Sequence, residues 1–504
     1  MMHASIVIDP NSTVGSVNRR LFGSFVEHLG RCVYDGIYEP GHPTADEHGF
    51  RGDVVELVRE LGVSTIRYPG GNFVSGYRWE DGVGPREQRP RRLDLAWHST
   101  ETNEVGLDEF AAWTATVDAE LMYAVNLGTR GVLDALDVLE YANIRSGTAL
   151  SDQRVANGFA EPHGIRMWCL GNEMDGPWQL GHSTAENYGA LAAKTARGMR
   201  QLDPDIDLVV CGSSGSQMST FGEWERVVLE ATYDEVDYIS CHAYYEPKDG
   251  DYASFLASAV DMDRFIDAVV ATADHVKALK RSDKTIDISF DEWNVWYQSR
   301  YNDVDKITDV DQWPVAPRLL EDEYSVVDAV VFGGLLISLL RHADRVTAAS
   351  LAQLVNVIAP IMTEPGGPAW RQTTFFPFAA TSRLARGASL ALRVDSPTHD
   401  TALHGEVRLV DAAATHDAQT GSTAVFAVNR SLTEPVELEL DVLALGHVGS
   451  VSALTLHDDD MHATNSLHAP ERVGLSQNPT ARVLDGKVVV TLPPVSWTAL
   501  NLEP

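Results

Sequence analysis

Short apolar runs alternate with longer amphipathic stretches from about Leu21 to Arg383. The longer stretches repeat apolar residues at three- and four-residue spacing, which predicts helices that each bury one face. The short runs predict strands that are buried on both faces. The expected strands are LFGSFVEHL from Leu21, STIRYPGG from Ser64, ELMYAVNLG from Glu120, IRMWCLGNE from Ile165, DLVVCGSSG from Asp207, VDYISCHAYY from Val236, TIDISFDEWN from Thr285 and TAASLAQLVN from Thr347. Eight strands that alternate with helices predict an α/β fold, a (β/α)8 TIM barrel.

The pattern changes after Arg386 to short alternating runs separated by Gly, Pro, Asn and Asp. This texture predicts a C-terminal antiparallel β-sandwich, jelly-roll-like in its strand number. The opening segment ASIVIDP is also strand-like and is expected to join that sandwich. We therefore predict an N-terminal strand in residues 1–15, a catalytic barrel in 16–385 and the sandwich in 386–504.

Polar side chains concentrate at the C-terminal ends of the predicted strands, the face on which barrel enzymes carry their active sites. A single polar residue at a strand end usually has only a structural role. Here strand after strand ends in this way, so the sequence predicts an active site on this face. The residues concerned are Glu27, His28, Arg67, Asn72, Asn126, Asn172, Glu173, His242, Tyr244, Tyr245, Glu292, Gln353 and Asn356.

Two of these residues, Glu173 and Glu292, suggest a particular chemistry. Glu173 ends the fourth predicted strand and Glu292 ends the seventh. In a ring of eight strands these side chains can face each other across the mouth of the barrel. Cleavage of a glycosidic bond needs a proton donor together with a second carboxylate that acts as nucleophile or base. In retaining enzymes the two carboxyl groups lie about 5–5.5 Å apart.

The two carboxyl groups need different environments for this chemistry. Glu173 must stay protonated near neutral pH, and an apolar surround of Trp168, Leu170 and Trp178 would favour its neutral form. Glu292 must be ionised to attack the sugar. Arg67 and Tyr244 are the expected partners that stabilise its anion.

Six blocks at these strand ends resemble the α-L-arabinofuranosidases of glycoside hydrolase family 51, and the resemblance covers nearly the whole barrel. The blocks are FGSFVEHLGRCVYDGIYEP, IRYPGGNFVSGYRWEDGVGP, WCLGNEMDGPWQ, CHAYY, FDEWNVWY and AQLVNVIAPIMTE. The resemblance implies that Glu173 is the general acid/base and Glu292 the nucleophile. It also implies that the following residues bind substrate: Glu27, Arg67, Asn72, Asn172, Tyr244 and Gln353 around the arabinofuranose, with Trp97 and Trp296 beyond the cleaved bond.

The expected function is that of a retaining, exo-acting α-L-arabinofuranosidase that releases terminal L-arabinofuranose from arabino-oligosaccharides or arabinoxylan fragments. The reaction proceeds through a covalent arabinosyl-enzyme and needs no metal or organic cofactor. One alternative is a retaining endo-β-glucanase or xylanase of the same clan, and another is a non-catalytic carbohydrate-binding protein. The resemblance further implies a homo-oligomer, commonly a hexamer.

Composition excludes several other partners and locations. With 39 basic and 72 acidic residues the chain carries a formal charge of −33, which argues against binding to nucleic acid or to an anionic membrane. The N-terminus lacks the basic and apolar regions of a secretory signal. The apolar stretch from Val326 contains Asp328 and two glycines, which favours a buried barrel helix over a membrane span. The four cysteines lack metal or redox spacing, so we expect free thiols and a cytoplasmic location.

Three features near the predicted site are interpreted as structural. Asp291 precedes Glu292 and, by strand alternation, is expected to point away from it. His28 and His242 could pair on a metal ion, but no third ligand stands at a suitable spacing. The glycines of YPGGN lack the Lys-Ser/Thr that follows in a phosphate-binding loop.

Overall fold

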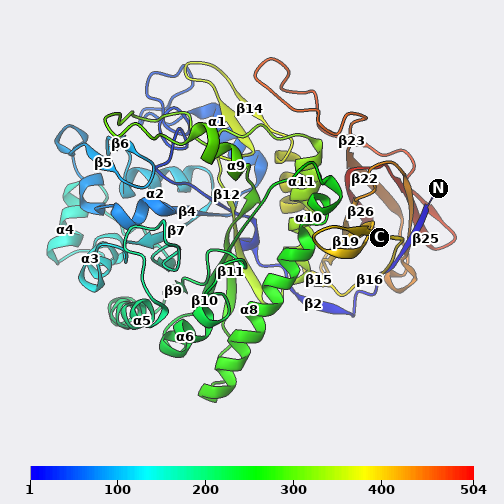
Figure 1. Cartoon of the computed structure of the whole chain (residues 1–504), viewed down its shortest axis with the longest axis horizontal. Coiled ribbons are helices and arrows are strands. Elements are labelled where there is room, and N and C mark those ends of the chain that lie inside the picture. Colours follow the sequence, from blue (N-terminus) through cyan, green and yellow to red (C-terminus); the bar gives the residue numbers. More distant parts are fainter. Residues whose placement is uncertain (1) are drawn as a thin grey trace.

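Eight parallel strands form a closed barrel in the computed structural model, which describes residues 2–504 (Figure 1). The order around the ring is β10-β11-β12-β3-β4-β7-β8-β9. Each expected strand overlaps one of them, so the predicted TIM barrel is confirmed. Their bounds are β3 Gly23–Phe25, β4 Thr65–Tyr68, β7 Glu120–Val125, β8 Met167–Leu170, β9 Asp207–Val210, β10 Tyr238–Tyr245, β11 Asp287–Val295 and β12 Val346–Ala352.

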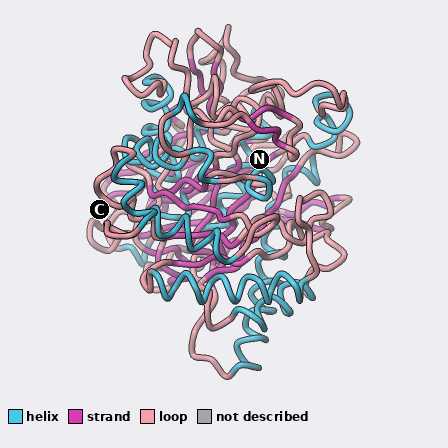
Figure 2. Tube along the Cα trace, turned by 90° about the vertical axis from the view of Figure 1, so that its left-hand side faces the viewer, coloured by secondary structure: helices cyan, strands magenta, loops and turns pink. Residues whose placement is uncertain are grey.

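Helices follow the barrel strands and lie outside them, as Figures 1 and 2 show. Helix α1 illustrates why they form, because Val54, Val58 and Leu61 share one buried face. It ends at Gly62, whose left-handed backbone lets its N–H bond the carbonyl of Val58. No helix of the described chain is long and apolar enough to cross a membrane. The helices are α1 Gly52–Leu61, α2 Leu107–Thr116, α3 Val132–Asn143, α4 Ala149–Ala156, α5 Ala185–Leu202, α6 Glu223–Thr232, α7 Tyr252–Leu256, α8 Ala259–Lys280, α9 Gln298–Arg300, α10 Val326–Arg341 and α11 Phe375–Leu384.

The two faces of each barrel strand enter different apolar layers. On β8, Met167 and Cys169 belong to the small cluster inside the barrel. Trp168 and Leu170 instead join the large core cluster between barrel and helices. This alternation follows from the two-residue period of a strand. All four cysteines, Cys169 among them, are buried and unbonded to one another, as the sequence predicts.

The C-terminal residues form two sheets that pack as a sandwich, again as predicted. Their strand orders are β16-β1-β21-β25-β24 and β2-β15-β19-β20-β26-β22-β23. Inward-facing residues such as Leu438, Val490 and Leu500 build a second core. The bounds are β1 Met2–Val7, β2 Thr13–Ser16, β15 Ala388–Leu390, β16 Arg393–Asp395, β19 Val410–His416, β20 Thr423–Asn429, β21 Val436–Asp441, β22 Ser450–Leu456, β23 Leu475–Gln477, β24 Arg482–Leu484, β25 Lys487–Leu492 and β26 Ser496–Glu503. Three hairpins lie outside these sheets: β5 Arg92–Asp94 with β6 Ser99–Glu101, β13 Ile361–Thr363 with β14 Ala369–Arg371, and β17 Thr398–Thr401 with β18 Gly405–Arg408.

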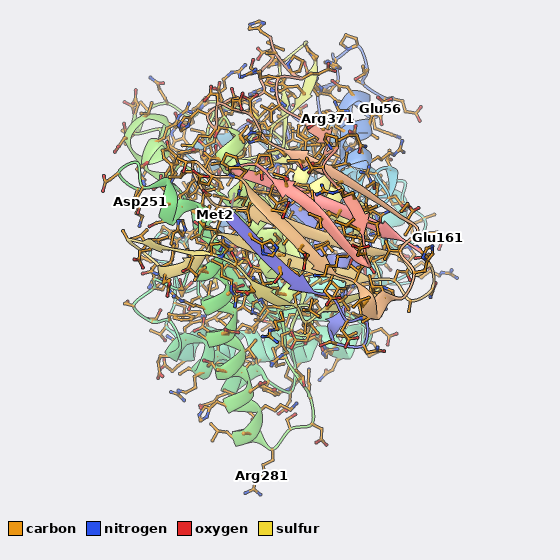
Figure 3. All side chains as sticks on the ribbon, turned by 90° about the vertical axis from the view of Figure 1, so that its right-hand side faces the viewer. Met2, Glu56, Glu161, Asp251, Arg281 and Arg371 are labelled. Atoms are coloured by element: carbon orange, nitrogen blue, oxygen red, sulfur yellow. The ribbon has the colours of Figure 1, made fainter. Side chains whose placement is uncertain are left out.

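The N-terminal strand β1 lies inside the five-stranded sheet of the sandwich. It pairs in parallel with β21 and antiparallel with β16. Figure 3 shows it in blue, starting at Met2, among strands from the other end of the chain. We propose the division into residues 1–15, 16–385 and 386–504. The end of α11 at Leu384 and the start of β15 at Ala388 support it.

Helix α10 joins the barrel to the sandwich. A Cβ atom placed on Gly333 of this helix would come within 2.2 Å of Trp497 on β26. The absence of a side chain at Gly333 therefore lets the indole pack directly on the helix. Nearby, the buried carboxylate of Asp411 on β19 accepts hydrogen bonds from Arg341 and Arg430. The apolar stretch from Val326 is thus a buried barrel helix, as predicted. The strands of the sandwich pack on it and bury it.

Candidate active site

The C-terminal ends of the barrel strands surround a cavity of about 800 Å³. Two of the ten predicted site residues, Arg67 and Asn172, are buried beside it and hydrogen-bond to one another. The structure therefore brings all ten predicted residues together. The other eight line the cavity: Glu27, Asn72, Trp97, Glu173, Tyr244, Glu292, Trp296 and Gln353.

Glu173 stands directly beyond β8, where the backbone turns sharply. Gly171 has a φ of 91° and Glu173 itself a φ of 43°, a left-handed conformation that is uncommon for a residue with a side chain. The carboxyl group is held at both oxygens. Its Oε1 lies 2.8 Å from Nδ1 of His242, and its Oε2 accepts the indole N–H of Trp178 at 2.8 Å.

The predicted apolar surround of Glu173 is wrong. Trp168 and Leu170 pack between barrel and helices, because the alternation that turns Cys169 inward turns them outward. Trp178 does contact Glu173, but it is 54% exposed and contributes a hydrogen bond. The immediate neighbours of the Glu173 carboxyl group are therefore polar N–H groups.

Glu292 has the two partners that the sequence predicts. Its Oε1 accepts a hydrogen bond from Nη1 of Arg67 at 2.8 Å, and its Oε2 accepts one from the Tyr244 hydroxyl at 2.7 Å. Burial raises the pKa of Glu292, whereas His242, Arg67 and the Tyr244 hydrogen bond act in the opposite direction. Arg67 also donates from Nη2 to Oδ1 of Asn172 at 2.6 Å, so one guanidinium orients both residues.

The two carboxyl groups face each other across the cavity. One oxygen of Glu173, one oxygen of Glu292 and a ring nitrogen of His242 all lie within 4.8 Å of one another. These are atoms of the kind that bind metals, but both nitrogens of His242 are engaged with carboxyl oxygens, which leaves neither one free to ligate an ion. The spacing also matches the carboxyl pair of a retaining glycosidase, which is about 5–5.5 Å.

The sequence predicts His242 on this face without a role in the site, whereas in the structure it contacts both catalytic carboxyl groups. Nε2 of His242 lies 2.9 Å from Oδ1 of Asp291, and its Nδ1 lies 3.6 Å from Glu292. Burial alone would lower the pKa of His242, but the surrounding carboxylates raise it to about 10. The two-residue spacing from Tyr244, which places both on one face of β10, was the signal that could have found it.

The expectation that Asp291 points away from Glu292 is also wrong, since both contact His242. The pairing of β11 with β12 shifts register between Phe290 and Trp293, and β10 shifts against β11 beside His242. Such irregularities break the strict alternation of side chains.

The other histidine of interest, His28, belongs to a separate network. Its Nε2 lies 2.7 Å from the hydroxyl of Tyr68, and its Nδ1 lies 2.9 Å from Oε2 of Glu101. Among the described residues His28 and His242 therefore do not share a ligand position.

Glu27 is held on one wall of the cavity by three neighbours. Its Oε1 accepts the backbone N–H of Phe73 at 2.8 Å and the indole N–H of Trp97 at 2.9 Å. Nε2 of Gln353 lies 3.3 Å from Oε2. Burial raises the pKa of Glu27 to about 8, although the hydrogen bonds from Phe73 and Trp97 act in the opposite direction.

The glycines of YPGGN make room for this carboxyl group. A Cβ atom on Gly71 would lie 2.5 Å from Oε2 and 2.8 Å from the carboxyl carbon of Glu27. We therefore expect Gly71→Ala to displace Glu27 and lower kcat/KM by about 10- to 100-fold, since small misplacements are costly in active sites. Steady-state kinetics on an aryl arabinofuranoside measures this effect. Gly41→Ala is the matched control, because its Cβ meets nothing within 4 Å. An unchanged kcat/KM in Gly71→Ala would contradict this account of the glycine.

Comparison with known proteins identifies the family. A model described as α-L-arabinofuranosidase 1 domain matches residues 57–269, and one described as α-L-arabinofuranosidase C-terminal domain matches residues 291–496. An intracellular exo-α-(1→5)-L-arabinofuranosidase of Streptomyces lividans is 63% identical, covering 99% of this chain and 75% of the relative. An exo-α-(1→6)-L-arabinofuranosidase of Bifidobacterium longum is 60% identical, covering 99% and 97%.

A solved structure gives the same result. The family 51 α-L-arabinofuranosidase AbfB from Bifidobacterium longum superposes with a TM-score of 0.95 at 50% identity, covering all of both chains. The name of the Streptomyces relative agrees with the cytoplasmic location that the sequence predicts. All of these similar proteins are arabinofuranosidases. They therefore support neither of the two alternatives, which were a retaining endo-β-glucanase or xylanase and a non-catalytic carbohydrate-binding protein. The chain belongs to glycoside hydrolase family 51 and is an α-L-arabinofuranosidase.

Proposed function

We propose that this enzyme removes terminal L-arabinofuranose from arabino-oligosaccharides by double displacement, with Glu173 as general acid/base and Glu292 as nucleophile. The observation that carries the proposal is the approach of the two carboxyl groups to within 4.8 Å. That distance leaves no room for a water molecule to attack from the far side, as an inverting enzyme requires.

In the first half-reaction a carboxylate oxygen of Glu292 attacks the anomeric carbon while the bond to the leaving oxygen breaks. Glu173 transfers its proton to that oxygen. Arg67 and Tyr244 orient the nucleophile. When Oε2 is the attacking oxygen, its hydrogen bond from the Tyr244 hydroxyl breaks as the new ester bond forms. The products are the shortened saccharide and an arabinosyl-enzyme.

In the second half-reaction Glu173, now a carboxylate, removes a proton from water. The resulting oxygen attacks the anomeric carbon, and Glu292 leaves as a carboxylate. Two inversions return arabinose in its starting configuration. Each step uses only side chains of this chain and water.

The polar wall residues bind the sugar hydroxyl groups. Asn172, which accepts a hydrogen bond from Arg67, would hydrogen-bond the 2-hydroxyl, a contact that strengthens in the transition state. Glu27 and Gln353, which line the cavity, would bind other hydroxyl groups of the sugar. A buried polar group of Glu27 or Gln353 without a hydrogen-bond partner would cost about 1–3 kcal/mol. Binding therefore favours a sugar whose hydroxyl groups pair with both residues.

The linkage that the enzyme cleaves depends on which hydroxyl oxygen of the remaining saccharide leaves. Relatives of similar identity are named for α-(1→5) and for α-(1→6) bonds. Since both leave through a primary hydroxyl, we propose that the natural substrate is a short arabino-oligosaccharide with such a terminal bond. The walls beyond the cleaved bond are aromatic, with Trp97, Trp178 and Trp296 all lining the cavity.

Product analysis on defined arabinan and arabinoxylan oligosaccharides tests the proposal. We expect monomeric arabinose as the released sugar, and NMR should show the α-anomer first. Release of longer oligosaccharides would contradict exo action, and a first-formed β-anomer would contradict the retaining mechanism.

We also propose, from the family resemblance, that the enzyme is a homo-oligomer, specifically a hexamer. Light scattering coupled to size-exclusion chromatography should then give about six times the 55.1 kDa of one chain. A mass of one chain across micromolar concentrations would rule this out.

A further inference from the structure

Asp291 lies behind the catalytic carboxyl groups without reaching the cavity. Its side chain is fully buried and is absent from the cavity wall. Oδ1 lies 2.9 Å from Nε2 of His242, and Oδ2 accepts the hydroxyl of Ser289 at 3.3 Å. Nε of Arg67 lies 3.9 Å from the same Oδ2. Asp291 is therefore in contact with two side chains that reach the catalytic pair.

His242 is enclosed by acidic groups from two parts of the chain. Asp291 and Glu292 face it from β11 and Glu173 faces it from the turn after β8, while the basic side chain of Arg67 on β4 contacts Asp291 and Glu292. Both ring nitrogens lie 2.8–2.9 Å from carboxyl oxygens, and an imidazolium satisfies both contacts by donating from each nitrogen. The pKa of about 10 agrees with a protonated ring at neutral pH.

We infer that Asp291 is a positioning residue that keeps His242 as an imidazolium, so that His242 occupies Oε1 of Glu173 and Oε2 carries the catalytic proton. This inference rests on the proposed role of Glu173 as acid/base. It goes beyond that role because it assigns the reactive oxygen and names the group that selects it.

The selection follows from where protons can reside. An imidazolium at Nδ1 can only donate, so Oε1 of Glu173 must accept and the acid proton must lie on Oε2. Oε2 accepts the indole N–H of Trp178 with one lone pair and keeps its O–H for the leaving oxygen. When that O–H bond breaks and the proton moves to the leaving oxygen, His242 still donates to the new carboxylate. His242 itself gains and loses no proton in either half-reaction.

Loss of the Asp291 charge reverses this arrangement. A neutral ring that donates from Nε2 has an acceptor at Nδ1, which would draw the acid proton to Oε1, on the side away from the leaving group. Acid catalysis would then fail although the carboxyl group of Glu173 is still present.

Asp291→Asn tests the inference, since it keeps the shape of the side chain and removes its charge. We expect kcat/KM for α-(1→5)-arabinobiose to fall by about 100-fold, because general acid catalysis contributes at least that factor. For 2,4-dinitrophenyl α-L-arabinofuranoside, which needs no protonation to leave, kcat/KM should change by less than about 3-fold. The nitrogen-15 NMR signals of His242 should move from imidazolium to neutral imidazole near pH 7.

Ser289→Ala is the matched control, because it removes a different hydrogen bond to Asp291 without changing any charge. It should retain wild-type kinetics on both substrates. Equal losses of Asp291→Asn on both substrates would show a merely structural role and overturn the inference. If that variant fails to fold, the NMR measurement on the wild-type enzyme decides, since a neutral His242 at pH 7 would overturn it equally.

Glu173→Ala, measured in parallel, separates this inference from the proposed function. If Glu173→Ala shows no dependence on the leaving group, the acid/base assignment itself is wrong. If Glu173→Ala shows that dependence and Asp291→Asn does not, only the role of Asp291 is wrong.

Discussion

Glu292→Ala should lower kcat on an aryl α-L-arabinofuranoside by about 10⁴-fold or more, because no other group can form the covalent intermediate. The residue is 5% exposed and held by Arg67 and Tyr244, so neighbouring side chains cannot easily take its place. Arg67 would instead be left facing the sugar with one partner fewer. Steady-state kinetics with a purified, folded variant measures the loss.

Two further variants make the result specific. Glu292→Gly should regain turnover in the presence of azide and yield the inverted β-arabinosyl azide, since the anion can enter the space of the lost carboxylate. Glu56→Ala, an exposed carboxylate on α1, is the control and should be indistinguishable from wild type. Intact turnover in Glu292→Ala would exclude the nucleophile assignment.

The second large effect concerns Glu173→Ala and depends on the substrate. On oligosaccharides with poor leaving groups we expect a loss in kcat/KM of about 10²- to 10⁴-fold, the usual contribution of general acid catalysis. On a dinitrophenyl arabinofuranoside the loss in kcat/KM should be small, because that leaving group departs without a proton. A series of aryl arabinofuranosides of graded leaving-group acidity checks this.

The second half-reaction provides an independent check on the same variant. Without Glu173 no group deprotonates water, so the arabinosyl-enzyme should accumulate on activated substrates and give a burst of phenol. Azide needs no deprotonation and should relieve the block, giving an arabinosyl azide of retained configuration. Equal losses across the aryl series would assign the acid/base role to another residue.

The barrel and the site face could be predicted because their signals repeat along the chain. Eight apolar runs followed by polar residues specify a parallel barrel with one functional face, whatever the details of each strand. Residues that end such runs, including Glu27, Asn172 and Gln353, therefore lie where the sequence places them. Their proposed roles come from the resemblance to a known family.

The environment of each catalytic group was harder to predict. Strand alternation assigned Asp291 away from Glu292, but the register shifts around β11 bring both to His242. No sequence pattern marks such a shift, because it depends on how three neighbouring strands pair. Trp168 shows a second limit of the sequence. A residue close to Glu173 along the chain can still lie on the other side of the barrel wall.

The space around Glu27 is a further case of this kind. Gly70 and Gly71 lie against the Glu27 side chain although more than forty positions separate them from it. The sequence shows a pair of glycines and cannot show what approaches them. The contact exists only in the folded barrel, where β3 pairs with β4 and brings the Glu27 side chain against the two glycines.

The position of β1 between β16 and β21 affects the order in which the parts of the chain can fold during synthesis. Strand β1 leaves the ribosome more than 400 residues before its parallel partner β21, which begins only at Val436. At about 5–20 residues per second, β1 waits roughly 20–90 s for that partner, with Ala4, Ile6 and Ile8 lacking the core that later buries them. During synthesis the barrel can close while β1 remains an unpaired strand open to misassociation. Strand β1 therefore needs protection from wrong pairing until β21 has been made.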